Sequence, residues 1–337
     1  MLSFLLRRLL WFGPVLMTVA IVTFFLMHRA PGGPWDSDKP VSSSTLENLN
    51  RRFGLDKPTW INPNAVADDW AEGERNPFAL SRDLVDSQFG NYVLDAARFD
   101  LGPTYRSRGA ESVQEVIRER LPTSAKVGIV GLVFAIGVGV PLGILSALRQ
   151  NSWLDVLSLF VATGGIAVPT FVSGILLLIF FSQGFGVSPI RRPEEWRGFG
   201  LAYLLPGIIL GLGTMAYLAR LTRSTMLEVK RQDFVRTARA KGLGETAVVG
   251  RHMLRNALIP IVTVLGPAAA DLLTGSFIIE TIFGVPGLGR EFVVSISRRD
   301  YSMIMGTTLF YALLIALANV TVDLSYGFID PRVRRSK

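Results

Sequence analysis

Long stretches without a charged residue dominate the hydrophobic pattern of this 337-residue chain. A bilayer's hydrocarbon core is about 30 Å thick, so a helix crosses it in roughly 20 apolar residues. Asp271 and Glu280 interrupt one such stretch, Ala257–Gly289. The other five are free of charge: Leu9–Met27, Val127–Leu148, Val156–Gly186, Gly198–Ala219 and Tyr301–Val322. The pattern predicts an all-α integral membrane protein with six transmembrane helices, and a loop near Gln183–Pro189 because the third stretch is too long for one helix.

The positions of these stretches divide the chain into four parts. We expect residues 1–28 to form an N-terminal signal-anchor helix that stays uncleaved, because no small-x-small cleavage site follows it. An extracytoplasmic insertion after this first helix occupies residues 29–122, and we expect a small α/β or irregular cap there. Residues 123–329 form a five-helix core that contains a long loop at residues 220–258. Residues 330–337 form a basic tail.

Basic residues predict the orientation of the helices. With the N-terminus inside, six crossings return the C-terminus to the same side. The interior segments then hold sixteen Lys and Arg residues, and the short exterior loops hold six. The long insertion is left out of the count, because long segments translocate regardless of charge. The prediction is a multi-pass protein with both termini in the cytoplasm.

Composition limits the chemistry that the chain can perform. Charged residues make up 18% of the chain, against about 25% in ordinary soluble domains. The net charge of +8 would raise the question of nucleic acid in a soluble protein, but here the positive charge follows the topology, so we expect no nucleic acid. The absence of cysteine excludes disulfides, iron–sulfur clusters and thiol nucleophiles, and two histidines argue against an imidazole-rich metal site.

The interior loop has the composition of two short basic helices. The segment Glu228–Lys241 favours a helix that ends at Gly242, since glycine suits the left-handed position after a helix. A second helical segment, Glu245–Leu258, places Val249, Met253 and Ala257 on one stripe. Two interpretations remain open at this point: a docking element for a partner protein, or a solvated basic loop that obeys the positive-inside rule.

Specific motifs lie within this loop. Residues 233–243 read Asp-Phe-Val-Arg-Thr-Ala-Arg-Ala-Lys-Gly-Leu, and residues 251–260 read Arg-His-Met-Leu-Arg-Asn-Ala-Leu-Ile-Pro. They resemble the "EAA" loop of ATP-binding-cassette (ABC) importer permeases, in particular the oligopeptide/dipeptide permease branch. The general pattern of that loop is met only at Ala238, Gly242 and Leu254, whereas the peptide branch's Arg-Thr-Ala-Arg-Ala-Lys-Gly-Leu is matched throughout. Further stretches agree with the same branch: Phe99–Tyr105, Leu121–Lys126, Ile279–Phe283, Pro286–Gly289, Arg299–Ser302 and Asp330–Pro331.

The resemblance implies a type I ABC importer permease fold in a bacterial plasma (inner) membrane. It implies four kinds of partner: a second homologous permease subunit, two ATP-binding-cassette ATPase subunits, an extracytoplasmic peptide-binding protein and the lipid bilayer. It also implies that the chain takes up peptides, with oligopeptides favoured over dipeptides, or alternatively nickel complexes or oligosaccharides. The residues expected to couple to the ATPase are Arg236, Thr237, Ala238, Arg239, Ala240, Lys241 and Gly242, with Gly242 as the hinge.

No G-x-x-x-x-G-K-[ST] sequence occurs in the chain, so it has no P-loop to hold ATP. We therefore expect a non-enzymatic pore subunit that binds no cofactor, with ATP and Mg on the partner ATPase subunits. The glycine-rich segment Gly284–Gly289 lies on the exterior side. Two interpretations remain open for it: a tight turn alone, or a turn with a gating role that involves Pro286, Gly287 and Gly289.

Acidic residues at membrane depth are costly and usually face protein or a cavity. Asp271 is either a pore-lining acid that meets a peptide's amino group or a hydrogen-bonded acid that joins two helices. Glu280 is expected to reach the interface or to pair with Arg290. In a different functional class, a proton-coupled secondary transporter, Asp271 would be the proton relay. An intramembrane enzyme is disfavoured, because neither histidine lies inside an apolar stretch.

Small residues gather on two of the predicted spans. Gly137, Gly139 and Gly143 lie on the second, and Gly207 and Gly211 on the fourth, where they have G-x-x-x-G spacing. Such faces let helices approach closely. The pattern predicts close packing within this subunit, with contact to a sister permease as the alternative.

Overall fold

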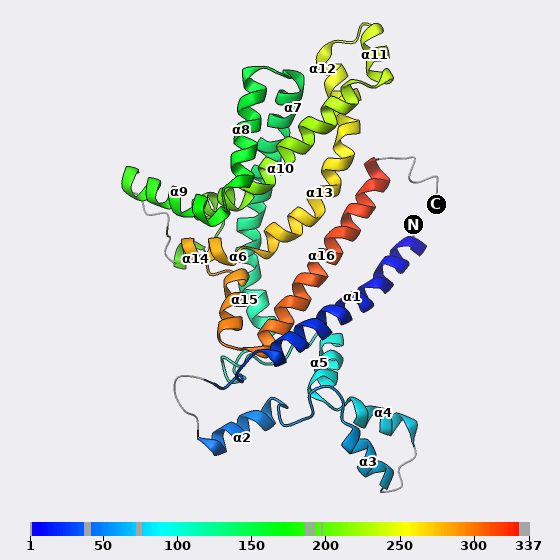
Figure 1. Ribbon diagram of the computed structural model, residues 1–337, viewed down its shortest axis with the longest axis vertical. Coiled ribbons are helices and arrows are strands. Elements are labelled where there is room, and N and C mark those ends of the chain that lie inside the picture. The colour runs from blue at the N-terminus through cyan, green and yellow to red at the C-terminus, as the bar shows by residue number, and fades with distance from the viewer. Residues whose placement is uncertain are drawn as a thin grey trace. The chain divides into compact units, whose positions relative to one another are not determined.

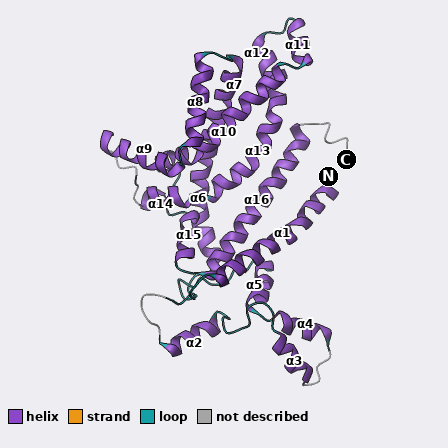
Figure 2. Cartoon of the chain, viewed as in Figure 1, coloured by secondary structure: helices purple, strands orange, loops and turns teal. Residues whose placement is uncertain are grey.

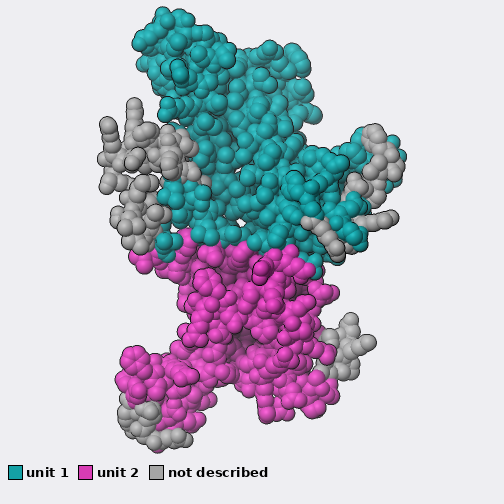
Figure 3. Space-filling model, turned by 180° about the vertical axis from the view of Figure 1, so that it is seen from behind, with its two compact units in different colours: residues 1–9, 120–290, 314–337 teal, residues 10–119, 291–313 magenta. Residues whose placement is uncertain are grey.

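The computed structural model describes residues 2–36, 42–71, 76–185, 190, 193–196 and 198–329. The regular structure within these residues is helical, and the one extended pairing among them is an isolated bridge between Pro103 and Ser112 (Figure 2). The chain divides into two compact units, coloured separately in Figure 3. One unit comprises residues 1–9, 120–290 and 314–337, and the other comprises residues 10–119 and 291–313.

Membrane-spanning candidates account for most of the long helices. Two helices, α8 (Trp153–Ala167) and α9 (Thr170–Phe185), qualify as a crossing only as a pair, and they are bent by 105° relative to each other. Five further segments are each long and apolar enough to cross a membrane: Arg7–Arg29, Val113–Leu148, Leu201–Lys230, Glu245–Thr274 and Tyr301–Thr321. The described residues thus hold five continuous candidate spans and one broken span, in agreement with the six predicted crossings.

The bend between α8 and α9 lies at Val168–Pro169. Val168 has an extended backbone, with φ −86° and ψ 119°. A residue before proline favours this conformation, because the proline ring clashes with a helical backbone at the preceding residue. Helix α9 continues through Gln183 and ends at Phe185, within the range where the sequence predicted a loop, Gln183–Pro189. Residues 186–189 lie outside the described residues, so most of that predicted loop stays a prediction.

Helix α10 (Leu204–Lys230) is central to the first unit and contacts α7 (Val140–Leu148), α8 and α13 (Arg255–Thr274) (Figure 1). A π-helical turn, η1, joins α6 to α7 within one continuous span. The first unit contains all or part of these elements: α6 (Val113–Phe134), η1 (Ala135–Gly139), α7, α8, α9, η2 (Pro193–Trp196), η3 (Leu201–Tyr203), α10, α11 (Asp233–Ala240), α12 (Glu245–Ala247), η4 (Val248–Leu254), α13 and α14 (Phe277–Phe283). Residues 2–9, 288–290 and 314–329, from three helices shared with the second unit, belong to the first unit as well.

Glycines allow the second and fourth predicted spans to touch through their backbones. A Cβ atom at Gly139 would lie 2.5 Å from the carbonyl oxygen of Met215. One at Gly207 would lie 2.9 Å from the carbonyl oxygen of Val127. Both distances are shorter than van der Waals contact, so the predicted close packing within the subunit is confirmed at these glycines. Gly137 has no neighbour within 4 Å of such a Cβ atom and contributes nothing to this packing.

The second unit is helical where the sequence suggested an α/β or irregular cap. Its buried centre joins Phe24 and Met27 of α1 to Tyr301 and Met305 of α16, and Tyr105 packs against them. The expectation of strands was wrong for the described residues, because short amphipathic helices cover this centre instead. The unit contains all or part of α1 (Leu2–Arg29), α2 (Ser43–Arg52), α3 (Pro63–Ala71), α4 (Pro77–Val85), α5 (Gln88–Ala97), α6, α15 (Leu288–Ser297) and α16 (Tyr301–Ile329).

Candidate functional site

The basic loop predicted at residues 220–258 contains a separate short helix, α11, which follows the end of α10 (Figure 1). The sequence predicted one helix over Glu228–Lys241, but the backbone is extended at Gln232, with φ −73° and ψ 148°. The N–H of Arg231 donates to the carbonyl of Glu228 at 3.2 Å and closes the end of α10. The prediction of a single helix was therefore wrong, and α11 starts afresh at Asp233 with its own direction.

Helix α11 has one buried side and one exposed side. Val235 and Ala238 are 0% and 4% exposed and pack with Met226, Val248 and Met253 of the neighbouring helices. On the other side, five of the seven predicted coupling residues are exposed: Arg236, Thr237, Ala240, Lys241 and Gly242. Of the remaining two, Ala238 belongs to the buried side, and Arg239 is half-buried.

Two apolar residues that the sequence analysis did not single out also lie on the exposed surface of this loop. Phe234 is 41% exposed and Leu243 is 42% exposed. Phe234 precedes the buried Val235, so its exposure could have been inferred from the helical spacing of the buried stripe. We call the exposed residues Phe234, Arg236, Thr237, Ala240, Lys241 and Leu243 the coupling surface.

The turn after α11 is closed by glycine and by an ion pair. Gly242 has φ +77°, which confirms the left-handed geometry predicted at this position. Its N–H donates to the carbonyl oxygen of Arg239 at 2.9 Å. The Arg239 side chain reaches across the turn and donates two hydrogen bonds to the carboxylate of Glu245, at 3.1 and 2.6 Å. Arg239 therefore holds α11 to the start of the next helix.

The second half of the loop is helical but irregular. The predicted helix over Glu245–Leu258 is divided into α12, the π-helical turn η4 and the beginning of α13. Met253 and Ala257 are fully buried as the predicted stripe requires, whereas Val249 is only half-buried and Val248 takes its place in the core. The π-helical turn explains this shift, because its wider turns change which residues share a face.

A buried carboxylate organises the glycine-rich segment Gly284–Gly289, which the sequence analysis predicted on the exterior side. Glu280 is 1% exposed. It accepts hydrogen bonds from the Ser124 hydroxyl at 2.6 Å and from the backbone N–H of Arg290 at 2.7 Å. Cβ atoms at Gly287 and Gly289 would lie 2.5 Å and 3.2 Å from this carboxylate. Of the two expectations for Glu280, reaching the interface was wrong, because the carboxylate is buried, whereas a contact with Arg290 is observed through its backbone N–H. The carboxylate occupies the space beside Gly287 and Gly289, so a larger side chain at either position would clash with it.

The outer segment is a turn followed by a short helix. Gly284 adopts the left-handed conformation, with φ +66°, at the end of α14. Pro286 is half-buried, while Gly287 and Gly289 are buried. The segment then continues as α15. The predicted tight turn is confirmed by this geometry, and its gating role stays a prediction.

Asp271 lies on α13 between two buried residues, Ala270 and Leu272, yet is itself exposed. Its carboxylate has no hydrogen-bond or ion-pair partner among the residues that the structure describes. The interpretation of Asp271 as an acid that joins two helices of this chain therefore finds no support within that part of the chain.

A second buried acid lies beside the C-terminal half of α10 and was not predicted as a site. Asp155 of α8 is 2% exposed and accepts two hydrogen bonds from Arg223 of α10, at 2.7 and 2.9 Å. The Ser146 hydroxyl and the backbone N–H of Asn151 also donate to it. The cluster ties α7, α8 and α10 together. Across the described residues, no group of three or more His, Asp or Glu side chains is arranged to hold a metal ion.

Known proteins are similar to this chain over nearly its full length. Residues 139–335 match the family "Binding-protein-dependent transport system inner membrane component". The dipeptide transport system permease protein DppB of Bacillus subtilis (strain 168) is 35% identical over 337 residues, which cover 100% of this chain and 99% of that protein. The oligopeptide transport system permease protein OppB of Escherichia coli (strain K12) is 33% identical over 335 residues, covering 99% of this chain and 100% of that protein.

A solved structure shares the fold. The MetNI methionine ABC transporter, in an inward-facing conformation, aligns with a TM-score of 0.52 and 17% identity over 64% of this chain and 97% of that chain. This agrees with the type I permease fold that the resemblance to ABC importer permeases implied. The family match covers more than half of the chain and the relatives cover almost all of it. The chain therefore belongs to the binding-protein-dependent transport system inner membrane components, in the oligopeptide and dipeptide permease branch of the ABC importers.

Proposed function

We propose that this chain is the pore-forming subunit of an ATP-driven importer that takes up peptides delivered by an extracytoplasmic binding protein. The observation that carries the proposal is the division of faces in α11 and the turn after it. Val235 and Ala238 are buried against their own subunit, whereas Arg236 and Lys241 of the coupling surface are exposed. An exposed apolar residue, Phe234, lies among these charges. A helix with this division of faces suits the groove of a partner subunit.

The partners follow from this proposal. Two ATPase subunits bind the coupling surfaces of this chain and of a second homologous permease, and they hold the ATP and Mg. Arg239 and Gly242 act by holding α11 in position, whereas Arg236, Thr237, Ala240 and Lys241 contact the ATPase. Ala238 contributes by packing the helix onto the core below it.

Motion of the ATPase subunits would reach the membrane through packed contacts. The buried face of α11 contacts Met226 at the end of α10 and Ala257 at the start of α13 through one apolar cluster. The Asp155–Arg223 pair fixes α10 to α8 one turn earlier along α10. A displacement of α11 is therefore transmitted to three helices rather than absorbed by a loose loop.

For the substrate, we propose peptides, with oligopeptides favoured over dipeptides. The relatives described above include a dipeptide and an oligopeptide transport protein, and the segment Phe99–Tyr105 supports the oligopeptide choice. Importers of nickel complexes or oligosaccharides are the alternative within the same type. The binding protein normally decides between these substrates, and we propose that residues 29–122 meet it on the exterior side.

For the translocation path, we propose Asp271 as a pore-lining acid and Pro286, Gly287 and Gly289 as part of the outer gate. An exposed carboxylate without a partner among the described residues is costly at membrane depth unless it faces water or another subunit. The outer segment is held to α6 through Glu280 and Ser124, so its position depends on that of the α6 helix. Peptide uptake by an Asp271→Asn variant tests the first part: equal losses for neutral and basic peptides would exclude a pore-lining role.

The proposed topology places both termini in the cytoplasm and residues 1–28 as a retained signal anchor. Residues 29–122 are extracytoplasmic, residues 123–329 form the permease core with its coupling loop at 220–258, and the basic tail at residues 330–337 lies outside the described residues. Single-cysteine labelling is direct here, because the chain has no cysteine of its own. Labelling of Thr246→Cys from outside intact cells would contradict this orientation.

Transport in proteoliposomes tests the central proposal. We expect uptake of an oligopeptide that needs ATP, the two ATPase subunits and the binding protein, that vanadate abolishes and that an uncoupler leaves intact. The proton-coupled alternative, with Asp271 as its relay, predicts the reverse: loss with the uncoupler and no response to vanadate. The presence of a dedicated basic docking helix favours the ATP-driven mechanism.

A further inference from the structure

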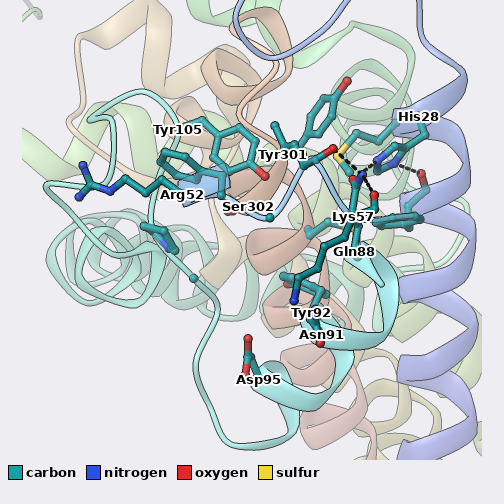
Figure 4. A pocket seen from close by; sticks show the side chains of 18 residues that line it. His28, Arg52, Lys57, Gln88, Asn91, Tyr92, Asp95, Tyr105, Tyr301 and Ser302 are labelled. Carbon is teal, nitrogen blue, oxygen red and sulfur yellow. Dashed lines mark hydrogen bonds between the residues drawn. The ribbon is translucent and has the colours of Figure 1, made fainter. Parts of the chain in front are cut away.

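A pocket of about 380 Å³ lies within the second unit and shares no residue with the coupling surface or the outer turn (Figure 4). It is lined by the end of α1, the segment that follows α2, one face of α5, residues 102–105 and the start of α16. Pockets that bind small molecules measure about 300–1,000 Å³. This pocket therefore has room for a small ligand and is too small for a folded partner.

One side of the pocket is an aromatic wall. The ring of Tyr105 lies 4.5 Å from that of Phe53 and 5.9 Å from that of Tyr301, measured between centroids. Behind the wall, Trp35 stacks on Tyr105 at 5.3 Å with an angle of 20°. Rings that support one another in this way are rigid, so the wall is formed before any ligand arrives.

Most polar groups of the pocket satisfy one another. The Gln88 amide donates to the carbonyl oxygen of Lys57 at 2.8 Å, and its oxygen lies 3.2 Å from Nε2 of His28. The Lys57 ammonium lies 2.5 Å from the Asp86 carboxylate, to which Asn91 also donates at 2.9 Å. The hydrogen bond from Lys57 holds the pKa of Asp86 below its ordinary value. The positive charge of Lys57 is thus neutralised inside the protein.

Three polar groups that line the pocket have no such partner among the described residues, and two of them lie on α5. The hydroxyl of Tyr92 is buried and makes no hydrogen bond to the described part of the chain. Burial raises the pKa of Tyr92, so the hydroxyl keeps its proton. Asp95 is exposed and likewise has no hydrogen-bond or ion-pair partner there. The two residues are three apart on α5 and therefore share a face; in Figure 4 they lie below the cavity with Asn91, and Tyr105 and Tyr301 lie above it.

This combination selects a ligand that carries an ammonium group on an apolar body. A free carboxylate attracts an ammonium group, a buried hydroxyl can accept a hydrogen bond from it, and tyrosine rings favour a nearby cation. A negatively charged group placed beside Asp95 would be repelled by it and would find Lys57 already paired. Arg52, at the end of α2, also lines the pocket and has no ion-pair partner among the described residues, so it suits the carboxylate at the far end of a short zwitterionic ligand.

On the basis of the peptide import proposed above, we propose that this pocket binds the N-terminal residue of a short peptide. Asp95 and the Tyr92 hydroxyl hold the α-ammonium group, and the first side chain lies against the Tyr105–Tyr301 wall. The permease would thereby carry a peptide site of its own in the insertion, separate from the coupling surface in sequence and in structural unit.

Peptide binding to the full-length permease with its partner subunits, in lipid nanodiscs and without a binding protein, tests this site. The probes are the tripeptide Phe-Ala-Ala and its N-acetylated form, and binding is measured by equilibrium dialysis. We expect the acetylated peptide to bind at least tenfold more weakly. Asp95→Asn should weaken the binding of Phe-Ala-Ala about tenfold and leave the binding of the acetylated peptide unchanged, since only the free amine makes a charge-assisted hydrogen bond. The matched control Asp68→Asn changes an exposed aspartate of α3 that does not line the pocket and should alter neither affinity.

A second variant separates ligand binding from folding. Tyr92→Phe removes a buried hydroxyl without a partner, so it should raise the melting temperature of the unliganded protein. The same variant should also weaken the binding of Phe-Ala-Ala about threefold. Equal binding of the two peptides, no binding of either, or equal affinities in the Asp95→Asn and Asp68→Asn variants would overturn the site. Failure of the wild-type transporter to import peptides in proteoliposomes would instead overturn the proposed function, and the binding results would be read independently of it.

Discussion

Replacement of Gly242 by valine tests whether the turn after α11 must keep its left-handed conformation. Residues other than glycine lose about 1–2 kcal/mol in this conformation, and a β-branched side chain suits it least. A Cβ atom at Gly242 would meet nothing within 4 Å, so backbone strain is the whole cost inside this chain. A cost of one or two kcal/mol is small against a typical folding free energy of about 5–15 kcal/mol, yet it shifts a local equilibrium by roughly 5–30-fold. The protein should therefore fold, and the turn should open.

An open turn separates α11 from the helix that follows. The Arg239–Glu245 pair spans the turn, so its two hydrogen bonds depend on the φ of +77° at Gly242. Once they are lost, α11 remains attached to its subunit mainly by Val235 and Ala238. We expect ATP hydrolysis to continue while peptide uptake falls, so that the ATP consumed per peptide imported rises several-fold.

Paired measurements of hydrolysis and uptake in proteoliposomes provide the assay. Gly244→Val is the matched control, because Gly244 is also exposed, has open space at its Cβ position and has φ −59° and ψ 147°, which valine adopts readily. Gly242→Asn should restore part of the coupling, since asparagine tolerates the left-handed region. Identical coupling ratios for Gly242→Val and Gly244→Val would refute the reasoning.

Three further substitutions probe the buried and paired carboxylates. Asp155→Asn leaves Arg223 without its charge partner and should cost about 3 kcal/mol; the thermal melting temperature in detergent should fall, and recovery should follow when Arg223 is also replaced by methionine. Gly287→Ala places a Cβ atom 2.5 Å from the Glu280 carboxylate and should cost about 1–3 kcal/mol as overpacking, with reduced peptide uptake at normal expression; unchanged uptake and melting temperature would contradict the packing argument. The pKa of Asp86 is lowered by its hydrogen bond from Lys57. The ion pair of these two residues therefore stabilises the insertion at pH values above 3.8, the ordinary pKa of an aspartate, and this stabilisation is lost as the pH falls through the lowered pKa. Tryptophan fluorescence should therefore change reversibly on acidification in the wild type, and an Asp86→Asn variant should lack this component.

The spans were predictable because the bilayer imposes a length on apolar stretches that no local detail can override. The position of the break in the third apolar stretch could not be predicted from its length, because apolar length does not determine where a backbone bends. Pro169 carried that information through the extended conformation it favours at Val168. The extended backbone at Gln232 had only a weak signal in Asp233, a poor helix former that suits the first turn of a new helix, because the residues before it favour a helix individually. Their helix is divided because α11 must turn its buried face toward the core.

At the candidate site, the sequence predicted features that depend on a few neighbouring residues. The left-handed Gly242 is one, because a glycine after a basic helix end is a local signal. The carboxylate cluster of Glu280 is different: its hydroxyl donor, Ser124, lies 156 residues away along the chain. No periodicity or motif connects two such positions. Arg223 and Asp155, which lie 68 residues apart, could not be paired from sequence for the same reason.

The environments of four carboxylates indicate which of them serve the fold and which are free to bind. Asp155 and Glu280 are buried and accept hydrogen bonds from several donors, so each is compensated within its own unit and has no capacity left for a ligand. Asp95 and Asp271 are exposed, and neither has a partner among the described residues. Side chains that contribute nothing to folding can be replaced at little cost in stability. Substitution of Asp95 or Asp271 should therefore change binding or transport without changing the melting temperature, whereas substitution of Asp155 or Glu280 should change the melting temperature first.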